Sequence, residues 1–360
     1  MLCKTLNIGN WKTAGNSKEI SRPVLYFCCM KQMKWAVVGL LLVAASCGTE
    51  KDPKTPPVEE PKEQLEQITI PAFDENKAFD LVKKQVEFGP RVPNSAGHQK
   101  CGDWLVQELK KVADTVIQQK ATVLSFDDKQ LKARNIIASF NAENPQRVML
   151  CAHWDTRPFS DQDPNTKNQA IPGANDGGSG VAVLLEMARL FKENPPRIGV
   201  DIILFDAEDY GQPDGMGQTE KANSYCLGSQ YWAKNLHVPG YRPRYGILLD
   251  MIGGPNAIYT KEGGSVQNAS SIVDKVWNTA GRLGYYSRFS NEITPPIVDD
   301  HYYINGLAGI PTIDIIEHDK STPSNFYKYW HTLNDTPENM DKSSLKAVGQ
   351  TLMDVVYREK

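Results

Sequence analysis

Imidazole and carboxylate side chains follow the apolar run 147–150, within the stretch from Cys151 to Gly180. His153 and Asp155 come directly after that run, and Asp176 precedes a glycine-rich turn and a helical pattern. One imidazole with two carboxylates is a ligand set typical of zinc, and an α/β sheet places such sites at the carboxyl ends of its strands. The stretch therefore predicts part of a metal site, and the rest of the chain must supply the other ligands.

Two further apolar runs also end in acidic residues. The run 200–205 leads to Glu208 and Asp209, and the run 245–249 leads to Asp250. A single carboxylate at such a position is usually a helix cap or a solvated end. Three acidic strand ends favour a shared site, because parallel strands bring their carboxyl ends to one rim of a sheet.

Two candidates lie late in the chain. His331 belongs to the segment WHT at 330–332, and Asp300 belongs to DDH at 299–301. His98 and His237 have no acidic constellation beside them in the sequence, so we interpret them as structural. His318 is expected in an exposed loop.

The elements that must position these groups follow from hydrophobic periodicity and from proline and glycine breaks. Strands alternate with helices from residue 147 onward, which predicts a single α/β domain with a doubly wound, mostly parallel mixed central sheet flanked by helices. The predicted helices are 75–87, 96–112, 180–193, 272–283 and 343–358, and the predicted strands are 115–126, 135–140, 147–150, 200–205, 245–250 and 310–316.

Composition excludes several classes of protein. The chain has 360 residues and a formal net charge of -3, which gives no electrostatic footprint for nucleic acid. The seven cysteines form no CxxC pair, which argues against a zinc–thiolate or iron–sulfur site. We expect Cys101, Cys151 and Cys226 to be buried free thiols, although an exported protein could form a disulfide among them.

The beginning of the chain has the features of a targeting sequence. Residues 30–47 combine a basic start, an apolar core too short to span a membrane, and the ending Ala44-Ala45-Ser46-Cys47, which resembles a bacterial lipobox. This predicts cleavage before Cys47 and lipid attachment there, with an ordinary secretory signal or an uncleaved anchor as the alternatives. Residues 1–29 are then an upstream extension, 48–70 a charged, proline-rich flexible tether, and 71–360 the catalytic domain. The protein would be exported, periplasmic or anchored to the outer membrane, with membrane contact only through lipidated Cys47.

The order HxD, NDGGSG, ED, LLD and WHT resembles the zinc-dependent aminopeptidase-like exopeptidase superfamily over residues 75–358. Within it, HWDTRP at 153–158, FDAEDYG at 205–211, DDHYYI at 299–304 and WHT at 330–332 are similar to the glutaminyl-peptide cyclotransferases, particularly the Bacteroidetes-type bacterial ones. The resemblance implies cyclisation of N-terminal glutamine of peptides and proteins to pyroglutamate with release of ammonia.

The resemblance also implies roles for single residues. One zinc ion per chain would be held by Asp176, Asp209 and His331, with the fourth coordination position open for substrate or water. Glu208 would be the general acid and base, and Asp250 and Asp300 would orient the proton transfer. In the animal cyclases a glutamate stands in the place of Asp209.

Two alternatives remain open on the same residues. In a di-zinc aminopeptidase, His153 and Asp250 would complete a second metal site and Asp155 would orient the histidine, whereas in a cyclase His153 and Asp155 would only support the first. A metal-free peptide-binding lipoprotein is the third hypothesis. An aromatic pocket for the short glutaminyl side chain is predicted from Trp330, Tyr329, Phe326 and Trp232, and for Trp232 a plain core position is equally open.

Overall fold

A computed structural model describes residues 69–213, 216, 219 and 221–360. The predicted extension 1–29, the predicted signal 30–47 and nearly all of the predicted tether 48–70 lie outside the described residues. None of the helices in the described ranges is long and apolar enough to cross a membrane.

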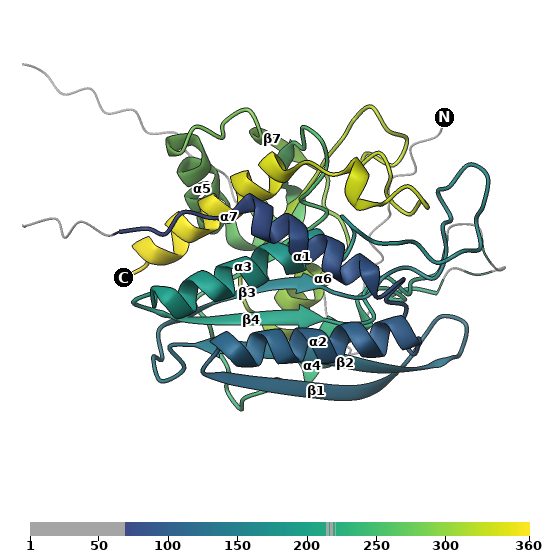
Figure 1. The fold of residues 1–360 in the computed structure, drawn as a ribbon, viewed down its shortest axis with the longest axis horizontal. Coiled ribbons are helices and arrows are strands. Elements are labelled where there is room, and N and C mark those ends of the chain that lie inside the picture. Colours follow the sequence, from purple (N-terminus) through teal and green to yellow (C-terminus); the bar gives the residue numbers. More distant parts are fainter. Residues whose placement is uncertain (1–68, 214–215, 217–218, 220) are drawn as a thin grey trace, which may run out of the picture. The chain divides into compact units, whose positions relative to one another are not determined.

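Six strands form the central sheet, in the order β1-β2-β4-β3-β5-β8. The strands β1, β2, β3 and β4 of this sheet are labelled in Figure 1. The strands β4, β3, β5 and β8 run parallel, and the hairpin of β1 and β2 joins β4 in an antiparallel arrangement. The prediction of a mostly parallel mixed sheet is confirmed. The strands are β1 (Thr115–Leu124), β2 (Gln130–Phe140), β3 (Arg147–His153), β4 (Gly199–Phe205), β5 (Gly246–Asp250) and β8 (Thr312–Ile316), and a separate two-stranded sheet consists of β6 (Tyr259–Glu262) and β7 (Phe289–Thr294).

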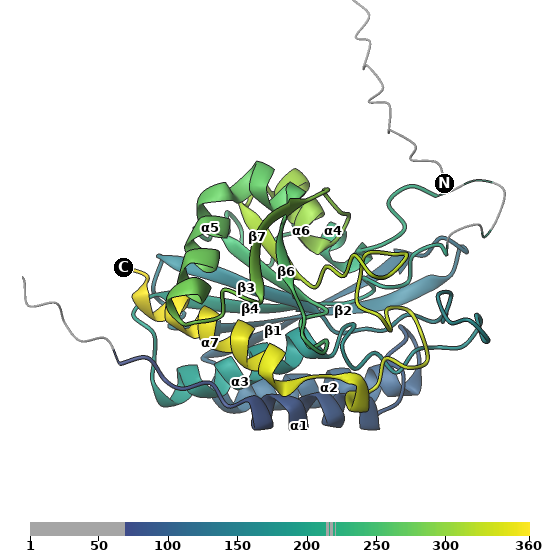
Figure 2. The same cartoon turned by 90° about the horizontal axis from the view of Figure 1, so that it is seen from above.

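Helices lie on both sides of the sheet, as Figure 2 shows. α1, α2, α3 and α7 pack together on one side, while α4, α5 and α6 lie on the other. The helices are α1 (Glu75–Glu87), α2 (Ala96–Val112), α3 (Ser179–Glu193), α4 (Leu227–Lys234), α5 (Gly263–Arg282), α6 (Asp300–Tyr303) and α7 (Lys342–Arg358), with a π-helical turn η1 (Ile304–Ala308) and a 3-10 turn η2 (Pro337–Asn339).

The alternation of side chains along β3 divides the core into two layers. Val148 and Leu150 belong to the apolar cluster that contains α1, α3 and α7, whereas Met149 and Cys151 belong to the cluster that contains α4. Every residue of β4, β5 and β8 is buried. Burial on both faces explains why these strands read as continuous apolar runs rather than as an alternating pattern.

The predicted bounds of α1 and α2 are confirmed, because both helices carry clear caps: Asp74 accepts hydrogen bonds at the start of α1, and Ser95 at the start of α2. The predicted helix 272–283 covers only the second part of α5, since helical structure begins at Gly263 and is interrupted by a kink at Ala269, where φ is -150°. Glu262 caps this end through the backbone N–H groups of two following residues, a signal that the glycine pair 263–264 conceals in the sequence.

Candidate metal centre and active site

The acidic strand ends meet at one rim of the sheet, as their recurrence predicts. β3 ends at His153, which is in register with Phe205 at the end of β4, and β5 ends at Asp250. Single donor atoms of His153, Asp176 and Asp250 all lie within 4.8 Å of one another. The parallel course of β3, β4 and β5 therefore produces the cluster, because it delivers three chain segments to the same edge.

Asp176, Asp209 and His331 form a second group of three buried donors whose ligand atoms lie within 4.8 Å of one another. His331 Nε2 is 3.2 Å from Asp209 Oδ1 and 3.7 Å from Asp176 Oδ2. Two buried oxygens, Asp176 Oδ2 and Asp209 Oδ2, have no hydrogen-bond partner among the described residues. Unpaired carboxylate oxygens around an imidazole are costly without a cation, so this donor set fits a zinc ion.

Residues outside the predicted set hold these donors in place. Asp161 Oδ1 is 3.3 Å from His331 Nδ1, the nitrogen that faces away from Asp176 and Asp209. Arg157 donates to Asp161 from Nε at 2.6 Å and to the carbonyl oxygen of Asp209 from Nη1 at 3.1 Å. Neither Arg157 nor Asp161 was among the residues predicted from the sequence. Arg157 is part of the HWDTRP segment, and Asp161 follows it by four residues in the same loop.

The carboxylate of Asp335 fixes the loop that carries Asp176. Its two oxygens accept the backbone N–H groups of Asn175 and Asp176 at 2.9 and 3.0 Å. Burial, followed by the nearby Asp176, raises the pKa of Asp335 to about 8. Asp335 lies only four positions after His331, so the C-terminal loop supplies one predicted ligand and supports another.

Replacing Asp161 by asparagine should weaken zinc binding by about 10–100-fold while the fold remains intact, because His331 loses the carboxylate that fixes its ring. Competition with a chelator of known affinity measures the change. Asp128→Asn, which removes an exposed carboxylate paired with Lys221, serves as the control. Zinc affinity equal to that of the unaltered protein would show that Asp161 does not orient His331.

In the second metal cluster predicted for an aminopeptidase, one nitrogen of His153 lies close to two carboxylates. Its Nε2 lies 3.2 Å from Asp176 Oδ1 and 3.1 Å from Asp250 Oδ1. Asp155 accepts the backbone N–H groups of Glu208 and Asp209 at 3.0 and 3.2 Å, and its Oδ1 lies 3.7 Å from His153 Nδ1. Asp155 thus holds the loop of the acid/base candidate, and the choice between support and second metal site for His153 stays a prediction.

Glu208 lies at the edge of this group with a side chain that is 12% exposed. Burial raises the pKa of Glu208 well above that of a free glutamate, His153 opposes the shift, and Asp299 and Asp209 add to it. A glutamate with a raised pKa beside a metal donor set is suited to accept and return a proton near neutral pH.

The carboxylates behind Glu208 differ in part from the predicted network. Asp250 has a pKa raised to about 7, first by burial, while its contact with His153 opposes the rise. Both oxygens of Asp300 are buried without a hydrogen-bond partner among the described residues. The neighbouring Asp299, which was not among the predicted site residues, has an oxygen within 4.8 Å of donor atoms of Glu208 and Cys226. The doublet Asp299-Asp300 therefore contributes two carboxylates to the region rather than one.

The predicted aromatic pocket divides into two places. Trp330 stacks on His331 with ring centroids 3.8 Å apart, and Phe326 lies 5.0 Å from Trp330. Tyr329 belongs to the same partly buried apolar cluster. Of the two positions left open for Trp232, the structure shows the core position rather than the pocket: this residue of α4 is fully buried and packs against Phe205 and Tyr241.

His98 and the three described cysteines lie outside the proposed metal donor set. The fold gives His98 an acidic partner that is distant in the sequence, since its Nε2 lies 2.9 Å from both carboxylate oxygens of Asp206. That pair supports the backbone just before Glu208 and leaves the structural interpretation of His98 unchanged. The prediction of free, buried thiols is confirmed for Cys101, Cys151 and Cys226.

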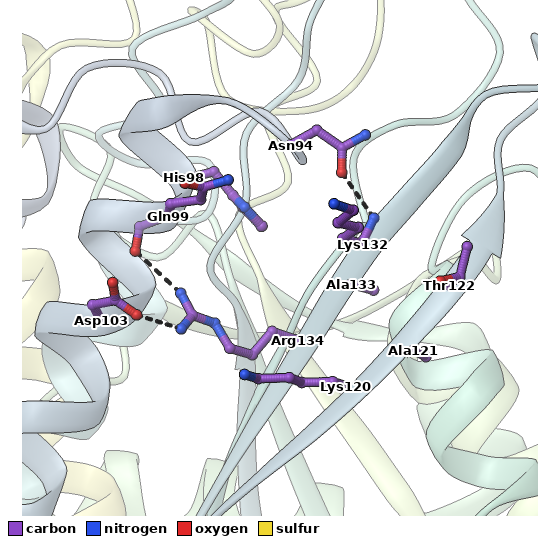
Figure 3. A pocket seen from close by; sticks show the side chains of 10 residues that line it. All are labelled: Asn94, His98, Gln99, Asp103, Lys120, Ala121, Thr122, Lys132, Ala133 and Arg134. Atoms are coloured by element: carbon purple, nitrogen blue, oxygen red, sulfur yellow. Dashed lines mark hydrogen bonds and ion pairs between the residues drawn. The ribbon is translucent and has the colours of Figure 1, made fainter.

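A cavity of about 760 Å³ lies away from the metal donors, between α2 and the hairpin of β1 and β2 (Figure 3). Arg134 lies across it and donates to Asp103 Oδ1 at 2.6 Å and to the carbonyl oxygen of Gln99 at 3.2 Å. Its described lining includes none of the predicted metal, catalytic or aromatic site residues. Lys120 and Lys132 in its wall are exposed, so we interpret it as an open polar groove.

The sheet order, the donor set and the adjacent glutamate define a zinc-exopeptidase-like enzyme, and the matching family is Peptidase family M28 over residues 135–356. The chain belongs to this family, and the resemblance stated from the sequence is confirmed. The family is zinc-dependent, in agreement with the three-donor group.

Two solved structures are similar over most of this chain. A glutaminyl cyclase from Bacteroides thetaiotaomicron, bound to N-acetylhistamine, is 48% identical with a TM-score of 0.80, over 81% of this chain and 100% of that one. A Zn-dependent exopeptidase from Parabacteroides distasonis is 49% identical with a TM-score of 0.79 and the same coverage of both chains. Among curated relatives, a glutaminyl-peptide cyclotransferase from Bothrops jararaca is 26% identical over 61% of this chain. The chain spans 56% and 63% of the length of the first curated relatives that it matches.

Proposed function

We propose that this protein is a zinc-dependent glutaminyl-peptide cyclotransferase that converts N-terminal glutamine of peptides and proteins to pyroglutamate and releases ammonia. The observation that carries the proposal is the position of Glu208 beside a complete set of three donors. The chain that carries this set is 48% identical to a glutaminyl cyclase whose whole length it covers. One zinc ion per chain, held by Asp176, Asp209 and His331, is part of the proposal.

Zinc bound to these three residues would supply a Lewis acid for the γ-amide oxygen of the substrate. The nucleophile is the α-amine of the substrate, so the reaction needs no serine or cysteine nucleophile from the protein. The amine nitrogen bonds to the γ-carbonyl carbon, and the bond from that carbon to the amide nitrogen breaks. Glu208 takes the proton from the attacking amine and returns it to the departing nitrogen, which leaves as ammonia.

Other residues of the chain position these steps. Asp155 accepts the backbone N–H groups of Glu208 and Asp209, so one carboxylate fixes both the base and a metal ligand. Trp330, Tyr329 and Phe326 give an apolar wall next to His331, which suits a short, neutral glutaminyl side chain. Asp250 and Asp300 are proposed to orient the proton transfer, and the burial of both supports this role.

A di-zinc aminopeptidase is the second candidate, favoured by the group of His153, Asp176 and Asp250 within 4.8 Å. Metal analysis combined with two substrates separates the two functions. A cyclase with about one zinc per chain releases ammonia from a glutaminyl peptide and leaves an aminoacyl anilide intact. Two zinc ions per chain with cleavage of the anilide would overturn the proposal.

We further propose that the protein is exported and anchored through lipid on Cys47, on the support of the sequence pattern at 30–47. Mass spectrometry of the mature protein from a membrane fraction tests this directly. The expected amino terminus is a lipid-modified Cys47, and an unmodified terminus at another residue would contradict it.

A further inference from the structure

Among the described residues, one hydrogen bond holds the carboxylate of Glu208, and its donor is a thiol. Cys226 Sγ lies 3.0 Å from Glu208 Oε1. The other oxygen, Oε2, is 4.0 Å from His153 Nδ1, too far for a hydrogen bond. Within the described residues, no other donor reaches either oxygen at hydrogen-bond distance. The orientation of the proposed acid/base group therefore depends on Cys226.

The backbone fixes the thiol next to Glu208. The N–H of Cys226 donates to the carbonyl oxygen of Glu208 at 2.8 Å, and the N–H of Leu227 donates to that of Ala207 at 2.9 Å. Ala207 and Cys226 both have left-handed backbones, with φ of 54° and 58°. Such angles are unfavourable for residues with a Cβ and persist where the surroundings impose them. Two strained turns are thus joined by two hydrogen bonds.

Close packing at Gly228 supports the same arrangement. A Cβ at Gly228 would lie 2.0 Å from the carbonyl oxygen of Asp206, so the start of α4 sits directly against the loop that carries Glu208. Asn135 ties the two segments together, because its side chain donates to the carbonyl oxygen of Gly228 at 2.9 Å and accepts the N–H of Asp206 at 3.0 Å. The thiol has little freedom to move away from Glu208.

The chemistry of the thiol suits a donor rather than a nucleophile. Burial, and then the nearby Glu208, raise the pKa of Cys226 well above that of a free cysteine, so the sulfur keeps its proton. A thiol is a weak donor, and it occupies one carboxylate oxygen only. The second oxygen stays free of hydrogen bonds.

We infer that Cys226 is a positioning residue: its S–H group holds Oε1 of Glu208, so that Oε2 is presented to the proton of the substrate amine. The inference rests on the proposed function for its catalytic consequence, but the hydrogen bond itself is independent of it. Cys226 is not one of the proposed metal donors, and it acts through Glu208.

Kinetics of three variants test the catalytic consequence. Cys226→Ala should lower kcat about tenfold with KM and zinc content unchanged, which corresponds to the loss of one hydrogen bond to a charged group. Cys226→Ser should recover most of the loss because the hydroxyl also donates. Cys101→Ala removes an equally buried thiol of α2 that does not donate to Glu208, and it should leave kcat unchanged. Equal losses in the serine and alanine variants, or no loss in either, would overturn the inference.

The infrared S–H stretching band tests the contact without any turnover. The band assigned to Cys226, identified by its disappearance in Cys226→Ser, should lie at lower frequency than that of Cys101 and move up in Glu208→Gln, where the charged acceptor is gone. If the Cys226 band has the same frequency in the unaltered protein and in Glu208→Gln, the hydrogen bond is refuted. A normal band shift in a protein that releases no ammonia from glutaminyl peptides would instead refute the proposed function and leave the contact established.

Discussion

Replacing Glu208 by glutamine should lower kcat for a glutaminyl peptide by about 10²–10⁴-fold while zinc stays bound. Glutamine has nearly the same shape, so the backbone contacts of residue 208 with Asp155 and Cys226 remain. The amide of glutamine cannot take a proton from the substrate amine. The substitution therefore removes the proton transfer and leaves the other steps in place. Steady-state kinetics and metal analysis on the same preparation measure both quantities.

The control for this variant is Glu193→Gln, which alters an exposed glutamate at the end of α3 that pairs with Arg189. It should leave kcat and zinc content unchanged. Loss of zinc from Glu208→Gln would mean that residue 208 is a metal ligand and that the roles of Glu208 and Asp209 are exchanged. Unchanged kcat with zinc retained would remove Glu208 from the reaction.

Replacing His331 by alanine should remove both zinc and activity. His331 is the single imidazole in the group with Asp176 and Asp209, and its Nε2 lies between their oxygens. Without it, two buried carboxylates face each other with fewer donors than a catalytic zinc site has. The loss in zinc affinity should exceed the roughly 10–100-fold expected for Asp161→Asn, because a ligand is removed rather than its support. Equilibrium dialysis against zinc buffers measures the affinity.

His318→Ala provides the comparison, since this partly exposed histidine belongs to none of the donor groups found in the described residues. It should bind zinc and turn over substrate as the unaltered protein does. If His331→Ala keeps one zinc ion per chain at full affinity, the metal is held elsewhere, and the group of His153, Asp176 and Asp250 becomes the first candidate.

Hydrophobic periodicity was enough to predict the buried strands that position the site. The buried strands β4 and β5 read as apolar runs, and the ends of these runs predict the positions of Glu208, Asp209 and Asp250 at one rim of the sheet. Asp176 and His331 could be predicted as partners only through the family resemblance, because they lie far apart in the chain and meet only in the fold.

Residues that act through loops were not predictable in the same way. Asp161 and Asp335 support His331 and Asp176 from irregular segments, where side-chain direction depends on turns rather than on a period. The thiol of Cys226 meets Glu208 because two residues adopt left-handed backbones, and neither is a glycine that would signal such a turn. Trp232 was predicted as a candidate for the aromatic pocket but packs in the core. The sequence does not indicate on which face of the sheet an aromatic side chain near the site segments packs.

Mass spectrometry of a peptide with N-terminal glutamine, incubated with the zinc-loaded protein, tests the central claim most directly. One spectrum separates the two reactions, because cyclisation removes ammonia from the peptide while cleavage removes the whole glutamine residue. We predict a product that has lost one ammonia and is blocked at its amino terminus, and that does not form with Glu208→Gln. A shortened peptide together with free glutamine would contradict the account.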